Sequence, residues 1–281
     1  MNIDEAATIA RPAQAPYRDY LSLTWQLSRR ELEAKYRGSI GGLIWMIAGP
    51  LLLMVIYTFV FGYVLQLRWA SAGVTVCSKA GAGVEFATIL FAGLSSFNFF
   101  AECVSRAPGL VVANPSLVKR VRFPSEILAL SAIQVATIGL LVNLGVLLVL
   151  QVILCGALST TLFLLPLALM PLVLFTLGIT WVFAAVGVYF RDINHVVVPI
   201  TTALMFSAPV IYPLDSVPAH LRSVLEWNPL TTPIEQIRNV LAKGVWLDWE
   251  AFLTSLVVGT LIAALGLWFF TKMKRGFGDV V

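Results

Sequence analysis

Few side chains in this sequence have the type and the spacing that chemistry requires. Cys77, Cys103 and Cys155 follow no C-x-x-C spacing, and His195 and His220 are the only histidines, so the usual ligands of a metal site are scarce. The sequence also lacks a phosphate-binding loop, a G-x-S-x-G elbow and an H-E-x-x-H pair. We therefore expect no catalytic residue, no metal and no cofactor bound by this chain.

The composition places the chain in a membrane. Of its 281 residues, 59% are hydrophobic and 12% are charged, with a mean hydropathy of +0.87, whereas about 25% of the residues of a soluble domain are charged. The net charge of +4 would suit a nucleic-acid partner, but basic residues in a membrane protein first indicate topology. We expect an all-α integral membrane protein in contact with membrane lipid and with no nucleic acid.

Six apolar runs are long enough to cross a bilayer, which takes roughly 20 helical residues. Prolines in the fourth and fifth runs remove backbone donors, but neighbouring helices can accommodate them. The predicted spans are residues 41–66, 84–103, 126–156, 161–190, 195–212 and 250–271.

Lysine and arginine are unequally distributed over the connections between these runs. Fourteen of the nineteen lie in the N-terminal arm, the second and fourth connections and the tail. The positive-inside rule assigns these parts to the cytoplasm, together with both termini. The predicted organisation is a cytoplasmic arm with an interface helix (1–40), a six-span domain (41–271) and a cytoplasmic tail (272–281).

An amphipathic helix is predicted before the first span, in YLSLTWQLSRRELEAKYRGS at residues 20–39. Apolar side chains recur on one face and charged side chains on another, and Glu31 with Lys35 and Glu33 with Arg37 are i,i+4 pairs. The helix either only anchors the chain at the cytoplasmic interface or also braces a cytosolic partner. Its assigned residues are Trp25, Arg29, Arg30, Lys35, Tyr36 and Arg37.

The connection before the last span, 213–248, has the pattern of two short helices separated by Asn-Pro at 228–229. In the second, we predict Thr232 as N-cap, Pro233 at the first helical position and Glu235 in a capping box. The pair of helices either dips back into the membrane edge or packs on top of the bundle. The apolar face of the second helix is formed by Ile234, Ile237 and Leu241.

Other polar residues are expected to have structural roles. Glu102 and Arg106 are spaced for an ion pair within one helix, which we favour over a proton relay. Cys77 and Cys155 both fall on the predicted outer side, where a disulfide is possible. Interhelical hydrogen bonding is the ordinary explanation for neutral polar residues inside spans, here Asn98, Gln134 and Asn143.

Three separated stretches resemble one family. They are YRGSIGGLIWMIAGP at 36–50, NPSLVKRVRFPSEIL at 114–128, and the region 189–241 that begins YFRDINHVVVPI. Together they resemble the membrane permease of bacterial ABC exporters for polysaccharides and polyol phosphates, which include O-antigen, capsule and teichoic acid exporters. The chain departs from many relatives at Ala129, where they have proline at a span entry.

The resemblance implies a homodimer of six-span subunits in the bacterial inner membrane, with two copies of a separate ATPase that binds ATP and Mg. A lipid-linked polysaccharide would leave from the cytoplasmic side through a central path. The connection 107–125 would carry a coupling helix, and re-entrant helices would precede the last span. The implied ATPase contacts are Asn114, Pro115, Leu117, Lys119, Arg120, Arg122, Phe123, Arg191 and Asp192.

Aromatic rings along the implied path could offer flat apolar faces to a glycan. Tyr57 and Phe61 on the first span and Phe206 and Tyr212 on the fifth are the candidates, although lipid-facing phenylalanines need no such role. A membrane-embedded enzyme of envelope glycan or lipid assembly is the alternative, as is a membrane scaffold.

Overall fold

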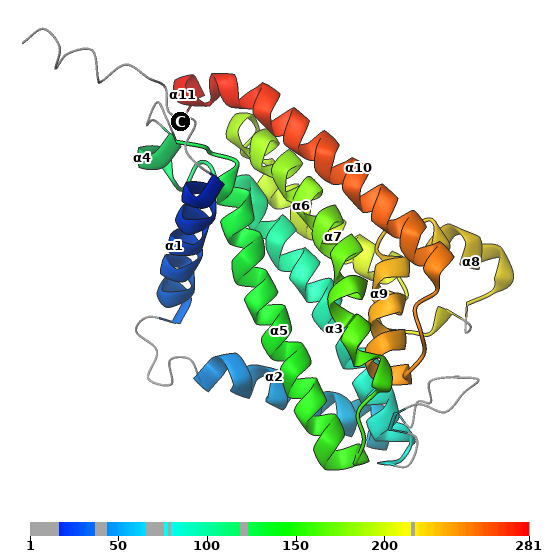
Figure 1. Ribbon diagram of the computed structural model, residues 1–281. Helices are drawn as coiled ribbons and strands as arrows, with labels where there is room; N and C mark the ends of the chain where they lie inside the picture. Colours follow the sequence, from blue (N-terminus) through cyan, green and yellow to red (C-terminus); the bar gives the residue numbers. More distant parts are fainter. Residues whose placement is uncertain are drawn as a thin grey trace, which may run out of the picture.

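The computed structural model describes residues 17–36, 44–65, 76–77, 80–118, 123–214 and 217–280. Over these residues the chain is helical, and most of its long helices run side by side in one bundle (Figure 1). The predicted all-α fold is therefore confirmed.

Five of the six predicted apolar runs coincide with a long helical element, the fifth run coincides with a shorter helix, and short helical segments lie in the connections. The elements are α1 (Tyr17–Tyr36), α2 (Ile44–Tyr57), η2 (Thr58–Val64), α3 (Ala82–Arg106), η4 (Ala107–Gly109), α4 (Pro115–Val118), α5 (Ile127–Cys155), η5 (Thr160–Leu164), α6 (Leu165–Tyr189), α7 (Ile193–Ser207), α8 (Ala219–Glu226), α9 (Thr231–Arg238), η7 (Asn239–Lys243), α10 (Trp249–Met273), η8 (Lys274–Gly276) and α11 (Phe277–Val280).

Five helices among the described residues are long and apolar enough to cross a membrane: Ile44–Phe61, Ala82–Gly109, Ile127–Cys155, Thr160–Tyr189 and Trp249–Gly276. The fifth predicted span is represented by α7, which has only 15 residues. It ends at Ser207 because proline at 209 disfavours the helical conformation of the residue before it, and Ala208 is accordingly extended, with φ −105° and ψ 149°.

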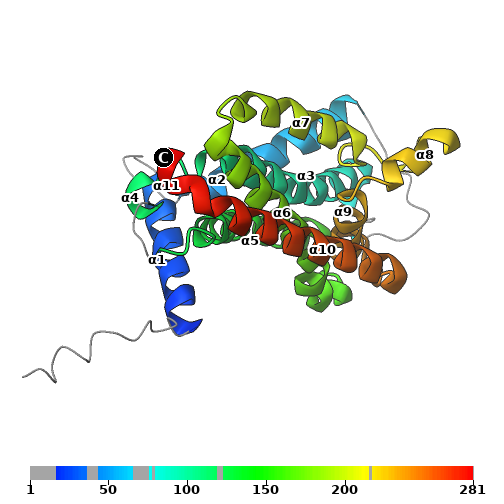
Figure 2. The ribbon, with the colours of Figure 1, turned by 90° about the horizontal axis from the view of Figure 1, so that it is seen from above.

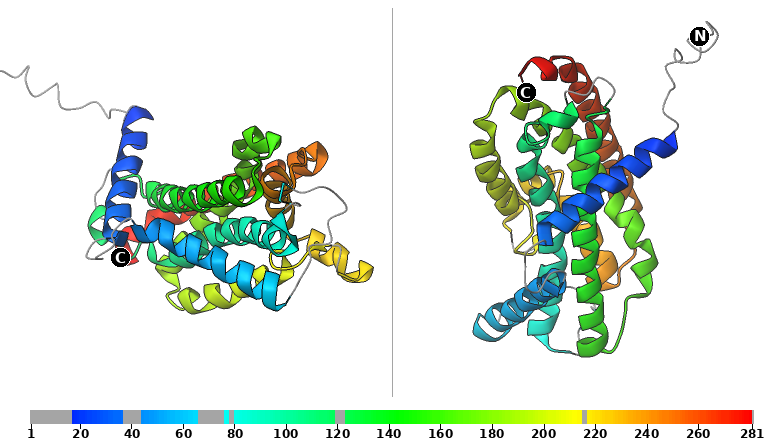
Figure 3. Two further views of the ribbon diagram at one scale, coloured as in Figure 1. Left: turned by 90° about the horizontal axis from the view of Figure 1, so that it is seen from below. Right: turned by 90° about the vertical axis from the view of Figure 1, so that its left-hand side faces the viewer.

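The first predicted span is the least buried of the five. α2 lies obliquely to the other long helices and contacts α3 and α5 (Figures 1 and 3). Most of its large apolar side chains are exposed, and Met54 is its only buried residue among those described. Apolar exposure of this kind suits a surrounding of lipid or protein rather than water.

Glycines allow α6 and α10 to approach at the backbone. A Cβ added to Gly266 would lie within 3.0 Å of the backbone of Gly178, and one added to Gly259 would lie 2.9 Å from the carbonyl oxygen of Pro171. Small residues at helix contacts are the usual means of close packing inside membranes. α10 crosses over α6 along this line (Figure 2).

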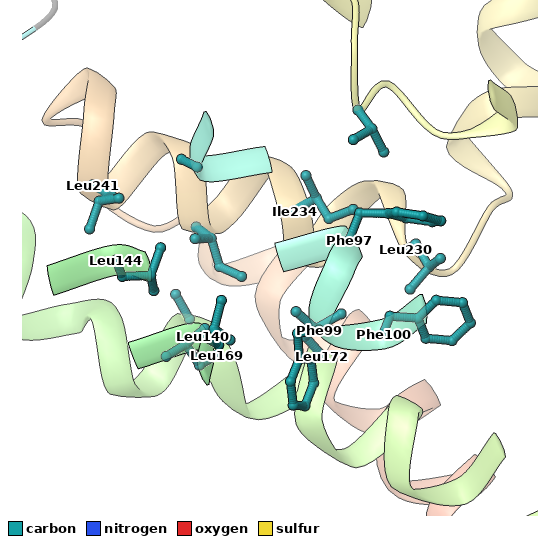
Figure 4. Packing of buried hydrophobic residues seen from close by; sticks show 14 of the residues in the cluster. Phe97, Phe99, Phe100, Leu140, Leu144, Leu169, Leu172, Leu230, Ile234 and Leu241 are labelled. Carbon is teal, nitrogen blue, oxygen red and sulfur yellow. The ribbon is translucent and has the colours of Figure 1, made fainter. Parts of the chain in front are cut away.

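The main hydrophobic core lies where α3, α5, α6 and α9 meet. Figure 4 shows aromatic side chains of α3 facing leucines of α5 and α6 and apolar residues of the α9 region. The side chains of α9 and of the following η7 that the sequence predicts on one apolar face are fully buried there. These residues are Ile234, Ile237 and Leu241.

The two short helices before α10 differ from each other in burial. α8 projects from the side of the bundle, with Leu221 exposed, whereas α9 is buried between α3 and α6 (Figures 1 and 2). The predicted N-cap was wrong: α9 begins at Thr231, before Thr232. Asn228 starts the turn earlier, because its side chain accepts the N–H of Leu230 and its carbonyl accepts that of Thr231, both at 3.0 Å.

Glu235 does not close a capping box, because it pairs with two cations. Its carboxylate accepts from Arg238 at 2.6 Å and from Lys243 at 3.2 Å. Burial alone would raise the pKa of the Glu235 carboxyl, but these two charges and hydrogen bonds lower it below its ordinary value, so Glu235 is ionised.

Arg238 is fully buried and links α9 to two other parts of the bundle. Its guanidinium donates to the carbonyls of Ile89 on α3 (3.2 Å), Pro209 (2.5 Å) and Val210. It fills the space beside Gly93, where any Cβ would overlap the guanidinium. Directly after α7 the chain is no longer helical, so the carbonyls of Pro209 and Val210 lack helical partners. Arg238 supplies hydrogen-bond donors to them.

A disulfide joins Cys77 to the last residue of α5, Cys155, with their Cα atoms 4.9 Å apart. The disulfide lies beside η7, a π-helical segment. Three of its carbonyls accept hydrogen bonds from residues outside the segment. Val240 accepts from Thr161 at 2.8 Å, Leu241 from Gln151 at 3.2 Å, and Ala242 from the N–H of Val76 at 3.2 Å.

Candidate functional site

One end of the bundle collects the segments for which the family resemblance implies a coupling role. We call it the α4 end, because α4, the turn between α6 and α7, and the C-terminal helix α11 all lie there (Figures 1 and 3). A hydrophobic cluster holds these segments together. It includes Leu27 of α1, Val111, Leu117 and Phe123 of the coupling connection, Val188 of α6 and Phe277 of α11.

The coupling connection begins with a segment that packs directly against α6. η4 follows α3 directly, and Pro108 lies so close to Gly187 that any Cβ at that position would overlap the Pro108 backbone. Asn114 starts α4: its carbonyl accepts the N–H groups of Leu117 and Val118, and its side chain donates to the carbonyl of Leu110 at 2.9 Å. The connection 107–125 therefore contains a short helix, α4, which begins directly after Asn114.

The predicted contact residues divide into anchors and exposed positions. Leu117 and Phe123 pack against the cluster of the α4 end, whereas Pro115, Arg191 and Asp192 are exposed. Asp192 stands immediately before α7 as its N-cap residue. Lys119, Arg120 and Arg122 lie outside the described residues.

The C-terminal segment also packs on the α4 end, which the sequence did not predict. Lys274 pairs with Glu126 at 2.7 Å, and the Tyr189 hydroxyl donates to the carbonyl of Met273 at 3.0 Å. The Trp181 indole donates to the Glu126 carbonyl at 3.2 Å. The lysines of the tail had been counted only as topology signals, so no pattern in the sequence pointed to these contacts.

α1 packs diagonally across α5 through small polar side chains (Figure 3). Ser28 is fully buried and donates to Gln134 at 2.7 Å, while Trp25 is 56% exposed. Leu21 is exposed as well, so these two apolar side chains of α1 face away from the bundle, as contact with lipid requires, whereas Leu27 packs on the cluster of the α4 end.

Charges connect α1 to the end of α3. Lys35 pairs with Glu102 at 2.7 Å, and Glu31 pairs with Arg106 at 2.9 Å. The predicted pair of Glu102 with Arg106 is present but long, at 3.9 Å. The predicted pairing of Glu31 with Lys35 is superseded by these contacts with α3.

The remaining residues assigned to α1 are solvent-facing or outside the described parts. Arg29 forms an exposed pair with Glu33 at 2.9 Å, and Arg30 is exposed. Tyr36 ends the helix, but its side chain, like all of Arg37, is not among the described parts.

The aromatic residues proposed for a substrate path form two pairs. The rings of Tyr57 and Phe61 are 6.1 Å apart. The Tyr212 hydroxyl donates to the carbonyl of Phe206 at 2.7 Å, and the Phe206 ring is exposed. Ile211 packs in the same cluster as Tyr57 and Phe61 and so connects the two regions.

Comparison with known proteins agrees with this arrangement. Residues 22–242 match the family model described as ABC-2 type transporter. The chain is 24% identical to an O-antigen export system permease protein of Klebsiella pneumoniae, over 91% of this chain and 93% of the relative. It is 25% identical to one of Myxococcus xanthus (93% and 96%) and 27% identical to a polysialic acid transport protein of Escherichia coli (85% and 89%).

The family match confirms the resemblance that the three sequence stretches indicate. The match covers most of α1 and all of the connection 107–125 and of α9. With several apolar helices and relatives named as permease and transport proteins, this chain is a multi-pass membrane transport subunit and not an enzyme; it belongs to the ABC-2 type transporter family.

Proposed function

We propose that this chain is the membrane subunit of an exporter that moves a lipid-linked polysaccharide, of O-antigen or capsule type, outward from the cytoplasmic side. ATP would be hydrolysed, with Mg, by a separate ATPase. The names of the relatives support the substrate class, since they are O-antigen export permease proteins and a polysialic acid transport protein.

The observation that carries the coupling part of this proposal is the α4 end. Two segments far apart in sequence, the connection 107–125 and the turn at Arg191 and Asp192, lie at the same end of the bundle, and both adjoin α6. A partner that displaced α4 would push on Pro108 against Gly187, where backbone meets backbone without an intervening side chain. Such contacts transmit displacement because packed interiors do not compress.

The functional unit proposed is a homodimer with two ATPase subunits in the bacterial inner membrane. Each subunit would have six spans, with α7 and the residues up to 212 as the fifth, and both termini in the cytoplasm. The burial of α9 supports a re-entrant position for the second short helix of 213–248. The arm 1–40 and the tail 272–281 would then lie on the ATPase side.

Charge reversal in the coupling connection tests this proposal. Arg120→Glu with Arg122→Glu should release the co-expressed ATPase during purification, or abolish export, while the chain still inserts. The matched control is Arg68→Glu with Lys79→Glu, which makes the same charge change in the first connection and should leave the complex intact. A complete complex with undiminished export in the Arg120/Arg122 variant would refute the coupling assignment.

A further inference from the structure

A groove between α2, α3 and α5 contains two adjoining cavities of about 170 Å³ and about 210 Å³. We call it the α2 groove. Both cavities are lined by Pro50 of α2, by Ser95 and Asn98 of α3, and by Asn143 of α5. α2 and α5 flank α3 where the groove lies (Figure 3).

The two carboxamides in this groove lack the partners that the sequence led us to expect. Gln134, the third neutral polar residue of these spans, accepts a hydrogen bond from Ser28 of α1. In the described part of the chain, the side chains of Asn98 and Asn143 have no hydrogen-bond partner and line the cavities instead. Asn98 is exposed and Asn143 is partly buried in the single chain, so both carboxamides are open to a molecule that enters the groove, and a polar occupant between these apolar helices could bond them.

The lining indicates the chemistry of that occupant. A carboxamide offers two donors and an acceptor, which suits vicinal hydroxyl groups. Trp45 lines the first cavity and Tyr57 lines the second. In both cavities the two carboxamides therefore share the lining with an aromatic ring. Within the described residues that line the two cavities, Lys35 is the one cation, and it is held by Glu102 at 2.7 Å. The groove therefore suits an uncharged polyhydroxyl group better than a phosphate, which would need a free cation.

We propose that the α2 groove is a saccharide subsite, in which Asn98 and Asn143 bond the hydroxyl groups of one sugar ring and Trp45 or Tyr57 covers its apolar face. The inference rests on the proposed function and deepens it. Each cavity is smaller than the roughly 300–1,000 Å³ of a typical ligand pocket, so the subsite holds one sugar unit while the rest of the glycan extends beyond it.

Thiol protection tests occupancy directly. In a Cys103→Ala background, Asn98→Cys and Asn143→Cys are made singly, with Thr260→Cys on exposed α10 as the control. The full-length chain in nanodiscs is treated with N-ethylmaleimide, alone or with lipid-linked polysaccharide extracted from the source cells. We expect the glycan to slow alkylation at positions 98 and 143 by about tenfold, as for a ligand present at about ten times its dissociation constant, and to leave position 260 unchanged.

Three further arms separate the sources of a polar occupant. The same lipid carrier with its glycan removed should give no protection; equal protection by the bare carrier would overturn the saccharide assignment. Nanodiscs of phosphatidylglycerol and of phosphatidylcholine should behave alike, and protection by phosphatidylglycerol alone would identify a lipid headgroup instead. Alkylation that no addition slows would mean that the groove holds only water.

Export measurements distinguish this inference from the proposed function. Asn98→Leu and Asn143→Leu should each raise the glycan concentration needed for half-maximal export by about two- to tenfold, since each removes one or two ordinary hydrogen bonds. Thr260→Val should change nothing. If the unmodified chain exports no lipid-linked glycan, the proposed function fails; if it exports and both asparagine variants match it, only the saccharide subsite fails.

Discussion

Replacing Arg238 by methionine should destabilise this protein far more than replacing an exposed arginine. The guanidinium is fully buried, pairs with Glu235 at 2.6 Å, and donates to the carbonyls of Ile89, Pro209 and Val210. Methionine fills similar space but donates no hydrogen bond. Three carbonyls and one carboxylate would therefore lose a charged donor in the interior.

The size of the effect follows from these contacts. Breaking a buried ion pair by removing one partner costs about 3–5 kcal/mol, and a buried acceptor left without a donor costs about 1–3 kcal/mol. These terms do not add in full, because the desolvation penalty of the guanidinium disappears with it and Lys243 still contacts Glu235. We expect a net loss of about 3–5 kcal/mol in unfolding free energy, or roughly 10 °C in apparent Tm.

The assay is thermal unfolding of the purified full-length chain in nanodiscs, followed by intrinsic tryptophan fluorescence. Arg29→Met is the control, because its pair with Glu33 is exposed and such pairs contribute only about 0–1 kcal/mol. Equal Tm values for Arg238→Met and Arg29→Met would refute the reasoning. Adding Glu235→Gln to Arg238→Met separates the two contributions: recovery indicates that the unpaired carboxylate dominates, and no recovery indicates the carbonyls.

Two other predictions concern packing and cross-linking. Gly266→Ala places a Cβ against the backbone of Gly178, so we expect a loss of about 1–3 kcal/mol or more in unfolding free energy. The control is Gly145→Ala on α5, where a Cβ would meet open space, and this variant should be neutral or slightly stabilising. Equal Tm values for the two variants would contradict the close contact. Cys77→Ser removes a disulfide with a sequence separation of 78 residues and should lower the unfolding free energy by about 2–4 kcal/mol. Reductant should cause the same loss in the unmodified chain, and the control variant Cys103→Ser should remain sensitive to reductant. A Tm unaffected by reductant would show that the disulfide contributes nothing to stability.

The α4 end suggests how a partner could move the bundle without touching most of it. η4, which begins the coupling connection, and the turn at Arg191 both adjoin α6, and α6 contacts α10 through glycines along its length. α1 is tied to the same end by Leu27 and to α3 by Lys35 and Glu31. A displacement of the coupling connection would therefore reach α3, α6 and α10 together.

The positions of the helices could be predicted from sequence with good accuracy, because an apolar run long enough to cross a bilayer has few alternatives to a helix. A helix within the connection 107–125 was implied by the family resemblance, and the apolar face that runs from α9 into η7 could be predicted from local periodicity. The N-cap of α9 could not be predicted from sequence. The side chain of Asn228 forms a turn that starts the helix before Thr232, and the amino-acid sequence does not specify the geometry of that turn.

The candidate site was predicted in part. The family resemblance implied that the coupling connection and the turn at Asp192 contact the ATPase. Their common packing against α6 could not be predicted, because Gly187 and Pro108 are far apart in sequence. Asn98 and Asn143 were noticed as polar residues inside spans and given an ordinary structural role. Only the arrangement of α2, α3 and α5 shows that they face a cavity instead.

The sequence by itself determined what is local: which segments are helices, which ends carry positive charge, and which family the chain resembles. Those properties depend on runs of neighbouring residues and on the cost of placing charge or an unbonded backbone in lipid. The tertiary structure alone decided what depends on distant partners. Arg238 was one basic residue among nineteen in the sequence, and it became the buried link between α9, α3 and the break after α7 only because the fold brings three carbonyls and Glu235 around it.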